Sequence, residues 1–336
     1  MEFFNNHIKL FTTAFLLFAG LTLIVCIIPA INNQSNNAPL PNAIPLSDDA
    51  IKGKAIFISN GCVACHTQQV RNVDMDKVWG ERPSIAADYA DNHRTDFWRN
   101  TATLMGTERT GPDLTNIGAR QPSKDWQLPH LFNPRIVVKE SIMPAYPWLF
   151  TVKDKVAKGD VVVNIPEEYL GGRIGKVVAT DEALQLLAYL QSLKQVKLPD
   201  GTPEPQFLYP KKAAANAPPA KPGEEPELDG AMLYANNCQS CHQANGEGLK
   251  GAFPPLKGSK IVLDDNSEVM VDIIMNGYNA NEEFGEMPAV GKNNKLKPEE
   301  VAAIMNHEKT SWGNSAKKVT NAQVKKMIEM VTKAKQ

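Results

Sequence analysis

The sequence has no excess of charge of either sign and very few cysteines. Its 336 residues include 36 Lys and Arg against 37 Asp and Glu, which disfavours a protein that binds nucleic acid through basic charge. Four of the five cysteines stand in two identical motifs and the fifth, Cys26, lies in an apolar run, so none is left for a disulfide framework. The length favours about two domains, and 43% hydrophobic with 22% charged residues is typical of globular protein.

Charge is also absent from Leu10 to Ile31, a run of 22 residues. As a helix this run is about 33 Å long, enough to cross a bilayer core of roughly 30 Å. A cleaved signal peptide is the alternative, but its apolar region is typically about 7–15 residues and no A-x-A-like site follows. A lipoprotein signal ending at Cys26 is disfavoured by the bulky Val25 before it. We therefore expect a retained membrane anchor.

The positive charges around this run predict its orientation. His7 and Lys9 precede the run, and no Lys or Arg follows it until Lys52. The positive-inside rule then places the N-terminus in the cytoplasm and everything after Asn32 on the outer side of the membrane.

The rest of the chain divides into two modules joined by a proline-rich linker. We predict an anchor and tether over residues 1–46, a first domain over 47–198, the linker over 199–228 and a second domain over 229–336. Residues 199–226 contain eight prolines, which favours an extended chain. Capping residues and apolar periodicity predict helices that begin at Ser47, Thr180, Asp229 and Pro298. A polar tail, 319–335, predicts an exposed helix, and residues 67–148 are expected to be irregular.

The strongest signal is the repeated motif Cys-x-x-Cys-His, at Cys62, Cys65, His66 and again at Cys238, Cys241, His242. Two cysteines on one turn reach the two vinyl groups of haem, and the following histidine then lies under the iron. A zinc site requires four ligands close in space, whereas these motifs are 176 residues apart, and a redox dithiol does not require the histidine. The sequence predicts two covalent haem c groups with His66 and His242 as axial ligands.

Methionine is the usual sixth ligand of electron-transfer cytochromes. In the second module Met287, in Gly-Glu-Met-Pro, is the candidate, while Met270 and Met275 lie in an apolar helical stretch and are expected in the core. In the first module Met143, followed by Pro144, is preferred. Met105 is its competitor.

Other residues of the first module have less specific signals. The loop Gly111-Pro112-Asp113-Leu114 is of a kind that packs near a proximal histidine. Arg71 and Arg135 are candidates for pairing with haem propionates, the alternative being solvated surface charge. His93, His130 and His307 are expected to be surface or hydrogen-bonding histidines.

The first module also resembles a known family through several blocks in a fixed order. These are the membrane anchor, GCVACHTQQVR from Gly61, RTGPDLTNIGAR from Arg109, HLFNPR from His130, ESIMPAYPWL from Glu140 and the closing TDEALQLLAYLQSL. Together they resemble the monohaem subunit (subunit II) of cbb3-type cytochrome c oxidases over roughly residues 8–195. The second module resembles class I cytochrome c domains in general. The resemblance implies a mainly α fold, with a single transmembrane helix followed by two class I cytochrome c domains.

By this resemblance the chain is a subunit in the bacterial inner membrane, with its haem domains on the periplasmic side. It would pass electrons from a soluble or membrane-bound donor to the catalytic subunit of a haem-copper oxidase. One membrane span and six histidines cannot by themselves form a haem-copper centre, so a separate polytopic chain is expected to reduce oxygen. The alternatives are the cytochrome subunit of a nitric oxide reductase and that of a periplasmic dehydrogenase.

Overall fold

A computed structural model describes residues 2–36, 44–92, 104–208, 228–279 and 284–333 of the chain. Its contacts divide the chain into two compact units. The first unit comprises Met1–Leu46, Ser84–Met105 and Val196–Glu204, and the second comprises Ser47–Pro83, Gly106–Gln195 and Pro205–Gln336. The secondary structure is mainly helical, which confirms the predicted fold class.

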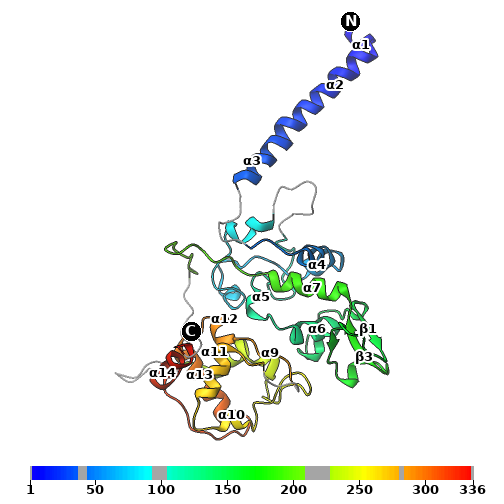
Figure 1. Cartoon of the computed structure of the whole chain (residues 1–336). Helices are drawn as coiled ribbons and strands as arrows, with labels where there is room; N and C mark the ends of the chain where they lie inside the picture. The colour runs from blue at the N-terminus through cyan, green and yellow to red at the C-terminus, as the bar shows by residue number, and fades with distance from the viewer. Residues whose placement is uncertain (1, 37–43, 93–103, 209–227, 280–283, 334–336) are drawn as a thin grey trace. The chain divides into compact units, whose positions relative to one another are not determined.

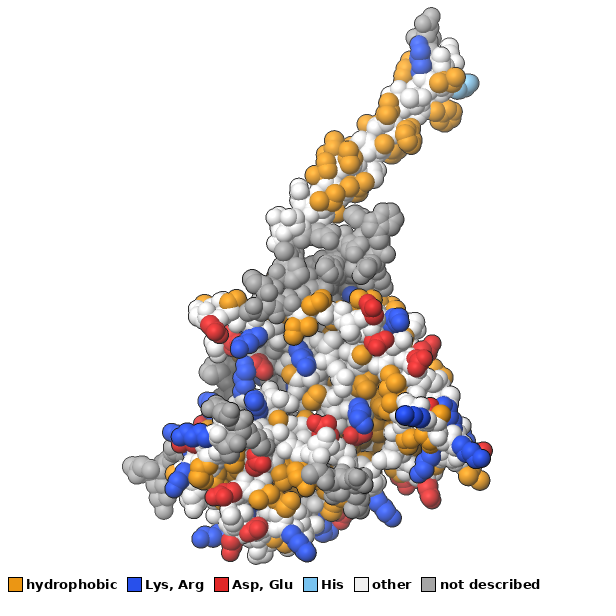
Figure 2. All heavy atoms as spheres, viewed as in Figure 1, with side chains coloured by type: hydrophobic (Ala, Val, Ile, Leu, Met, Phe, Trp, Pro, Cys, Tyr) orange, Lys and Arg blue, Asp and Glu red, His pale blue; other side chains and the backbone are white. Residues whose placement is uncertain are grey.

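The first unit contains the apolar N-terminal helix, which runs without a break in Figure 1 from α2 (His7–Leu21) through η1 (Thr22–Ile27) to α3 (Ile28–Asn36). A short helix, α1 (Glu2–Asn5), precedes it, and η4 (Ala86–Asn92) lies in the same unit. Residues His7–Asn33 form the candidate membrane span, and no residue of its most apolar stretch is buried against the rest of the protein. Hydrophobic side chains cover the face of this helix that Figure 2 shows. The turn of η1 is π-helical just before Pro29, which lacks the N–H that an α-helix would need there.

Two helices form the frame of the first module: α4 (Asp48–Ser59) and α7 (Asp181–Ser192). Ser47 and Thr180 cap them as predicted, each accepting a hydrogen bond from a backbone N–H three residues on. The helices cross closely at Gly53, where a Cβ would come 1.9 Å from the carbonyl oxygen of Gln185. A side chain at position 53 would therefore force the two helices apart.

Short elements connect these helices: η2 (Cys62–Ala64), η3 (Asp74–Val78), α5 (Ile117–Arg120), α6 (Lys124–Phe132), η5 (Pro134–Ile136), η6 (Pro147–Leu149) and η7 (Glu167–Tyr169). The prediction that 67–148 is irregular missed α6, because Pro129 inside it is a signal against a helix. A small antiparallel sheet was also missed. Its strands are β1 (Phe150–Lys153), β2 (Val162–Val163) and β3 (Lys176–Ala179), in the order β1-β3-β2.

The second module repeats the frame of the first. Its elements are α8 (Gly230–Asn237), α9 (Gln239–His242), α10 (Lys260–Leu263), α11 (Glu268–Asn276), α12 (Val290–Asn293), α13 (Pro298–Thr310) and α14 (Asn321–Lys333). Helix α8 lies against α13 at Gly230, where a Cβ would come 2.2 Å from the carbonyl oxygen of Ala303. In both modules a glycine of the helix before the motif thus allows close contact with a later helix, α7 in the first module and α13 in the second.

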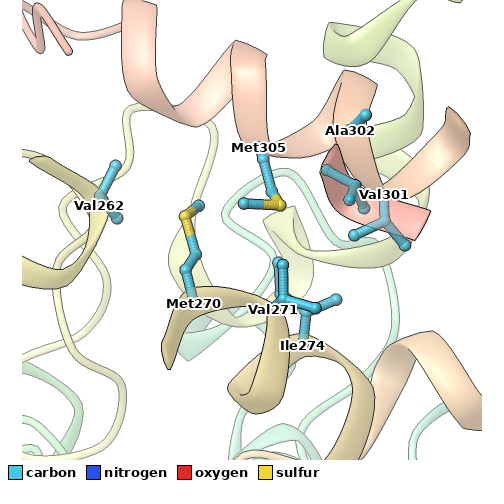
Figure 3. Close-up of a cluster of buried hydrophobic side chains, with 8 residues drawn as sticks. Val262, Met270, Val271, Ile274, Val301, Ala302 and Met305 are labelled. Atoms are coloured by element: carbon cyan, nitrogen blue, oxygen red, sulfur yellow. The ribbon is translucent and has the colours of Figure 1, made fainter. Parts of the chain in front are cut away.

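A buried apolar cluster joins α10, α11, α13 and α14, and its side chains converge in Figure 3. Met270 belongs to this cluster and Met275 packs on it, which confirms the prediction that both are core residues. The predicted C-terminal helix is present as α14 and most of its residues are exposed, but one face of it packs into the cluster. Val324 of α14 is fully buried in the cluster, and Met327, Ile328 and Val331 pack against it.

Candidate haem sites

Each Cys-x-x-Cys-His motif forms the same turn. In the first module the amides of Cys65 and His66 both donate to the carbonyl oxygen of Cys62, at 3.2 and 3.0 Å. In the second module the amides of Cys241 and His242 donate in the same way to Cys238, at 3.1 and 3.0 Å. One turn therefore presents two thiols and an imidazole together, as covalent haem attachment requires.

The two histidines of these turns make the same hydrogen bond. His66 Nδ1 lies 2.8 Å from the carbonyl oxygen of Pro112, and His242 Nδ1 lies 3.0 Å from that of Pro254. A carbonyl can only accept, so Nδ1 donates and Nε2 keeps the lone pair that binds a metal. Burial lowers the pKa of both imidazoles, which favours the neutral, ligating form. The expectation that the Gly-Pro-Asp-Leu loop packs near the proximal histidine is confirmed.

A buried ionic cluster fixes this loop in the first module. Both oxygens of Asp113 accept hydrogen bonds, from the Thr67 hydroxyl at 2.6 Å and from the amides of Gln69 and Thr115 at 2.7 and 2.8 Å. The Arg109 guanidinium donates to Thr67 Oγ1 and to the carbonyl oxygen of Gln69, and it pairs with Asp76 and Asp113. The chain that follows His66 is thereby tied to the chain that carries Pro112.

The loop that contains Met143 is held against the first motif. Arg135 Nη1 donates to the carbonyl oxygen of Met143 at 3.1 Å, and the Tyr146 amide donates to the carbonyl oxygen of Leu131 at 3.0 Å. The Trp148 indole Nε1 donates to Asn60 Oδ1 at 3.0 Å, two residues before Cys62, and burial, with the nearby Cys62 thiol, raises the pKa of Tyr146 to about 12. The predicted ligand thus lies five residues before a side chain that is bonded to the chain just ahead of the first motif. Tyr146 lies in the ESIMPAYPWL block, but the sequence predicted no separate role for it.

The second module has a cavity bounded by all four of its predicted haem residues: Cys238, Cys241, His242 and Met287. Met287 is held there by two backbone hydrogen bonds of 2.9 Å with Tyr278. Phe253 and Pro254 line another part of the wall. Two residues of the first module, Arg120 and Gln121, complete the lining, and sequence reasoning did not anticipate them.

Orphaned polar atoms test whether haem fits these sites. Arg120 Nε and Gln121 Oε1 are buried at the second cavity and have no hydrogen-bond partner within the described residues. In the first module His130 Nδ1 is buried without such a partner, and burial followed by the charge of His66 lowers the pKa of His130 to about 3. Buried polar atoms normally have hydrogen-bond partners. Each site therefore has a polar side-chain atom that the polar substituents of a bound haem would satisfy.

Other predicted residues are placed differently. Arg71 pairs with Asp76, and Arg135 binds the Met143 loop. His130 is buried and stacks on Trp126, with ring centroids 4.5 Å apart, whereas His307 lies 3.1 Å from Ser311 through Nδ1. Met105 is partly exposed, and His93 lies outside the described residues. In the parts of the chain that are described, no three His, Cys, Asp or Glu residues gather to hold a bare metal ion.

Two Cys-x-x-Cys-His turns define a c-type cytochrome, because each histidine is hydrogen-bonded to a proline carbonyl through Nδ1 and the same helical frame occurs in both modules. Residues 1–171 match the family described as cytochrome c oxidase, mono-haem subunit/FixO, and residues 225–307 match that of cytochrome c oxidase, cbb3-type, subunit III. The chain belongs to the FixO family of mono-haem oxidase subunits, with a second cytochrome domain fused to it. Covalently bound haem c is therefore its cofactor, and the family implies association with the catalytic subunit of a cbb3-type oxidase.

Among characterised relatives, cytochrome c-552 of Thermus thermophilus is 38% identical over 97 residues, which are 27% of this chain and 73% of that protein. The cytochrome c subunit of quinone alcohol dehydrogenase from Gluconacetobacter polyoxogenes is 30% identical over 230 residues, 65% of this chain and 45% of that protein. The fructose dehydrogenase cytochrome subunit of Gluconobacter japonicus is 32% identical over 105 residues, 30% of this chain and 22% of that protein. This chain thus spans less than half of both dehydrogenase subunits.

Proposed function

We propose that this chain is a membrane-anchored dihaem cytochrome that delivers electrons to the oxygen-reducing subunit of a cbb3-type oxidase. The proposal rests above all on the two equivalent motif turns, each with its histidine hydrogen-bonded to a proline carbonyl, in a chain that matches the FixO family. Haem c supplies a one-electron carrier at each turn. The attachment cysteines are Cys62, Cys65, Cys238 and Cys241, and the axial pairs are His66 with Met143 and His242 with Met287.

The haem number has a direct test. The denatured chain should keep haem in a peroxidase-stained gel, and the double substitution Cys62→Ala/Cys65→Ala should halve the haem per chain. The reciprocal variant, Cys238→Ala/Cys241→Ala, should halve it equally. A full haem content in either variant would contradict two attachment sites.

The function itself is tested by the partner that co-purifies in detergent. We expect a polytopic subunit with a haem-copper centre, and oxygen uptake that needs this chain. The second candidate function, a subunit of a periplasmic quinone alcohol dehydrogenase, is supported by the 230-residue match to such a subunit. It would instead co-purify with a dehydrogenase subunit and be reduced by alcohol. A nitric oxide reductase would consume nitric oxide in the same assay.

We further propose that the N-terminus is cytoplasmic and that both haem modules are periplasmic. The electron would enter at the His242 haem and leave from the His66 haem, whose module belongs to the oxidase family. Terminating the chain near Pro199 should leave a complex that still oxidises small artificial reductants but accepts electrons slowly from its natural donor. Undiminished transfer from that donor in the truncated form would refute this order.

A further inference from the structure

The two modules meet at the attachment turn of the second haem. Trp126 Nε1 donates to the carbonyl oxygen of Ser240 at 3.0 Å. Gln121 Nε2 lies 3.1 Å from Ser240 Oγ and 3.7 Å from Cys241 Sγ. Both donors come from the first module, and both reach the turn whose cysteines carry the second haem. The first module therefore contacts the second within bonding distance of a haem-bearing sulfur.

A second contact between the two modules joins Asp125 to the chain just before Met287. Asp125 Oδ2 accepts from the amide of Glu286 at 3.3 Å, one residue before the predicted ligand Met287. A Cβ at Gly285 would come 2.7 Å from Asp125 Cβ, so only glycine allows this approach. The carbonyl oxygen of Gln121 accepts a 2.6 Å hydrogen bond from Gln127, which fixes the segment within its own module.

The other end of the same segment reaches the proximal ligand of the first haem. His66 Nδ1 is hydrogen-bonded to Pro112, and the next carbonyl along the chain, that of Asp113, accepts from Arg120 Nη2 at 3.2 Å. Arg120 is bonded in turn to Gln121, at the Cys241 sulfur. A continuous path of covalent and hydrogen bonds thus runs from the imidazole of one site to the attachment cysteine of the other.

We propose that the segment Arg120–Trp126 is the electron-transfer contact between the two haems. It rests on the proposed function only in that both motifs carry haem. One electron moves from the ferrous haem of one module to the ferric haem of the other, with no proton or bond transferred. Electron tunnelling weakens steeply across empty space, so bonded atoms that fill the gap between two carriers speed the transfer. The indole of Trp126 adds a second path beside Gln121, stacked on His130.

The first test asks whether the modules dock in this way in solution. Lys295 of the second module forms an ion pair with Glu81 of the first, and a zero-length carbodiimide joins only lysines and carboxylates in contact. Treatment of the full haem-loaded chain should yield a peptide that links these two residues, identified by mass spectrometry. Its absence, with other lysine-carboxylate links present, would overturn the docked contact.

The second test measures transfer between the haems in the purified full chain. After flash reduction by a small reductant, the electron redistributes between the two haems. The rate of this redistribution is compared between the wild-type chain and each variant. The midpoint potentials of both haems are measured in each protein, because they set the driving force. Haem content is determined first, so that a failure of the two-haem proposal is recognised separately. We expect the double variant Gln121→Leu/Trp126→Leu to slow redistribution severalfold. Trp126→Phe, which keeps a ring but loses the indole donor, should slow it less.

The control removes another hydrogen bond between the same modules. Asn164 Nδ2 donates to the carbonyl oxygen of Gly251 at 3.0 Å, away from the path described above. Asn164→Ala should leave the rate unchanged. A wild-type rate in the double variant would overturn the proposal, and so would an equal slowing in Asn164→Ala, because the segment would then act only by holding the modules together. If the double variant fails to load haem, wild-type rates in both Trp126→Phe and Gln121→Leu would overturn it.

Discussion

Gly111 lies directly against the imidazole ring of His66. A Cβ at position 111 would fall 2.3 Å from Cε1 and 2.8 Å from Nδ1 of the histidine. The Gly111 amide also donates to the carbonyl oxygen of Cys65 at 2.9 Å. The glycine is therefore required by the close approach of the loop to the ring.

Replacing Gly111 by Ala should displace the His66 ring and weaken its hydrogen bond to Pro112. We expect an altered spectrum or loss of the first haem, with a destabilisation of about 1–3 kcal/mol from overpacking. Haem staining, the ferrous absorption spectrum and urea unfolding measure these effects. Gly20→Ala is the control, since Gly20 lies within helix α2 and faces open space, and it should keep both haems. An unchanged Gly111→Ala spectrum would contradict the contact.

Met143→Ala and Met287→Ala should each open one iron to carbon monoxide and lower one midpoint potential. The thioether favours the ferrous state, so its loss lowers the potential of its own haem and leaves the other nearly unchanged. Redox titration and carbon monoxide difference spectra measure both effects. Met105→Ala is the matched control. If it altered the first haem while Met143→Ala did not, the assignment in that module would be wrong.

Arg109→Leu should destabilise the first module by about 3–5 kcal/mol, because it removes the buried cation that pairs with the buried carboxylates of Asp76 and Asp113. Urea unfolding of the full chain measures the loss. The exposed pair Lys257–Glu247 provides a comparison. Lys257→Met should cost at most about 1 kcal/mol. Equally small losses of stability in Arg109→Leu and Lys257→Met would show that the Arg109 cluster does not stabilise the first module more than an exposed ion pair does.

Glu308 of α13 makes the stability of the second module depend on pH. Its side chain is buried, and burial raises its pKa from 4.5 to about 8. The native state therefore keeps a proton that the unfolded chain releases, so this contribution is complete below pH 4.5 and is lost as pH rises through 8. The slope between these values is about 1.4 kcal/mol per pH unit. Urea unfolding from pH 5 to 9 should show this slope, and Glu308→Gln should remove it.

The helices of the frame were predictable because their signals are local. Ser47, Thr180 and Asp229 each cap a helix three residues from the amide that they accept from. The small sheet was not predictable. Val177 and Val163 pair across residues 164–176, which include three glycines. Strands of two to four residues are too short to show a clear alternation of apolar and polar side chains. The burial of one face of the C-terminal helix was missed because it depends on tertiary packing against α11 and α13, which its own polar sequence does not reveal.

The candidate sites divide in the same way. The motif residues and the methionines lie in short sequence patterns that are typical of haem attachment and iron ligation. Tyr146 near Cys62, and Gln121 and Trp126 at the second motif, have no short pattern that predicts a role for them. Their roles depend on which surfaces meet after folding.

The sequence by itself determined that this chain has an apolar N-terminal stretch and two Cys-x-x-Cys-His motifs, because both are patterns of neighbouring residues. Tertiary structure decided which carbonyl each histidine binds, and it placed Pro112 and Pro254 in equivalent positions from segments 46 and 12 residues away. It also decided that the first module completes the wall of the second cavity. Such contacts depend on how whole surfaces pack after folding. At position 285, for example, only glycine leaves room for the side chain of Asp125.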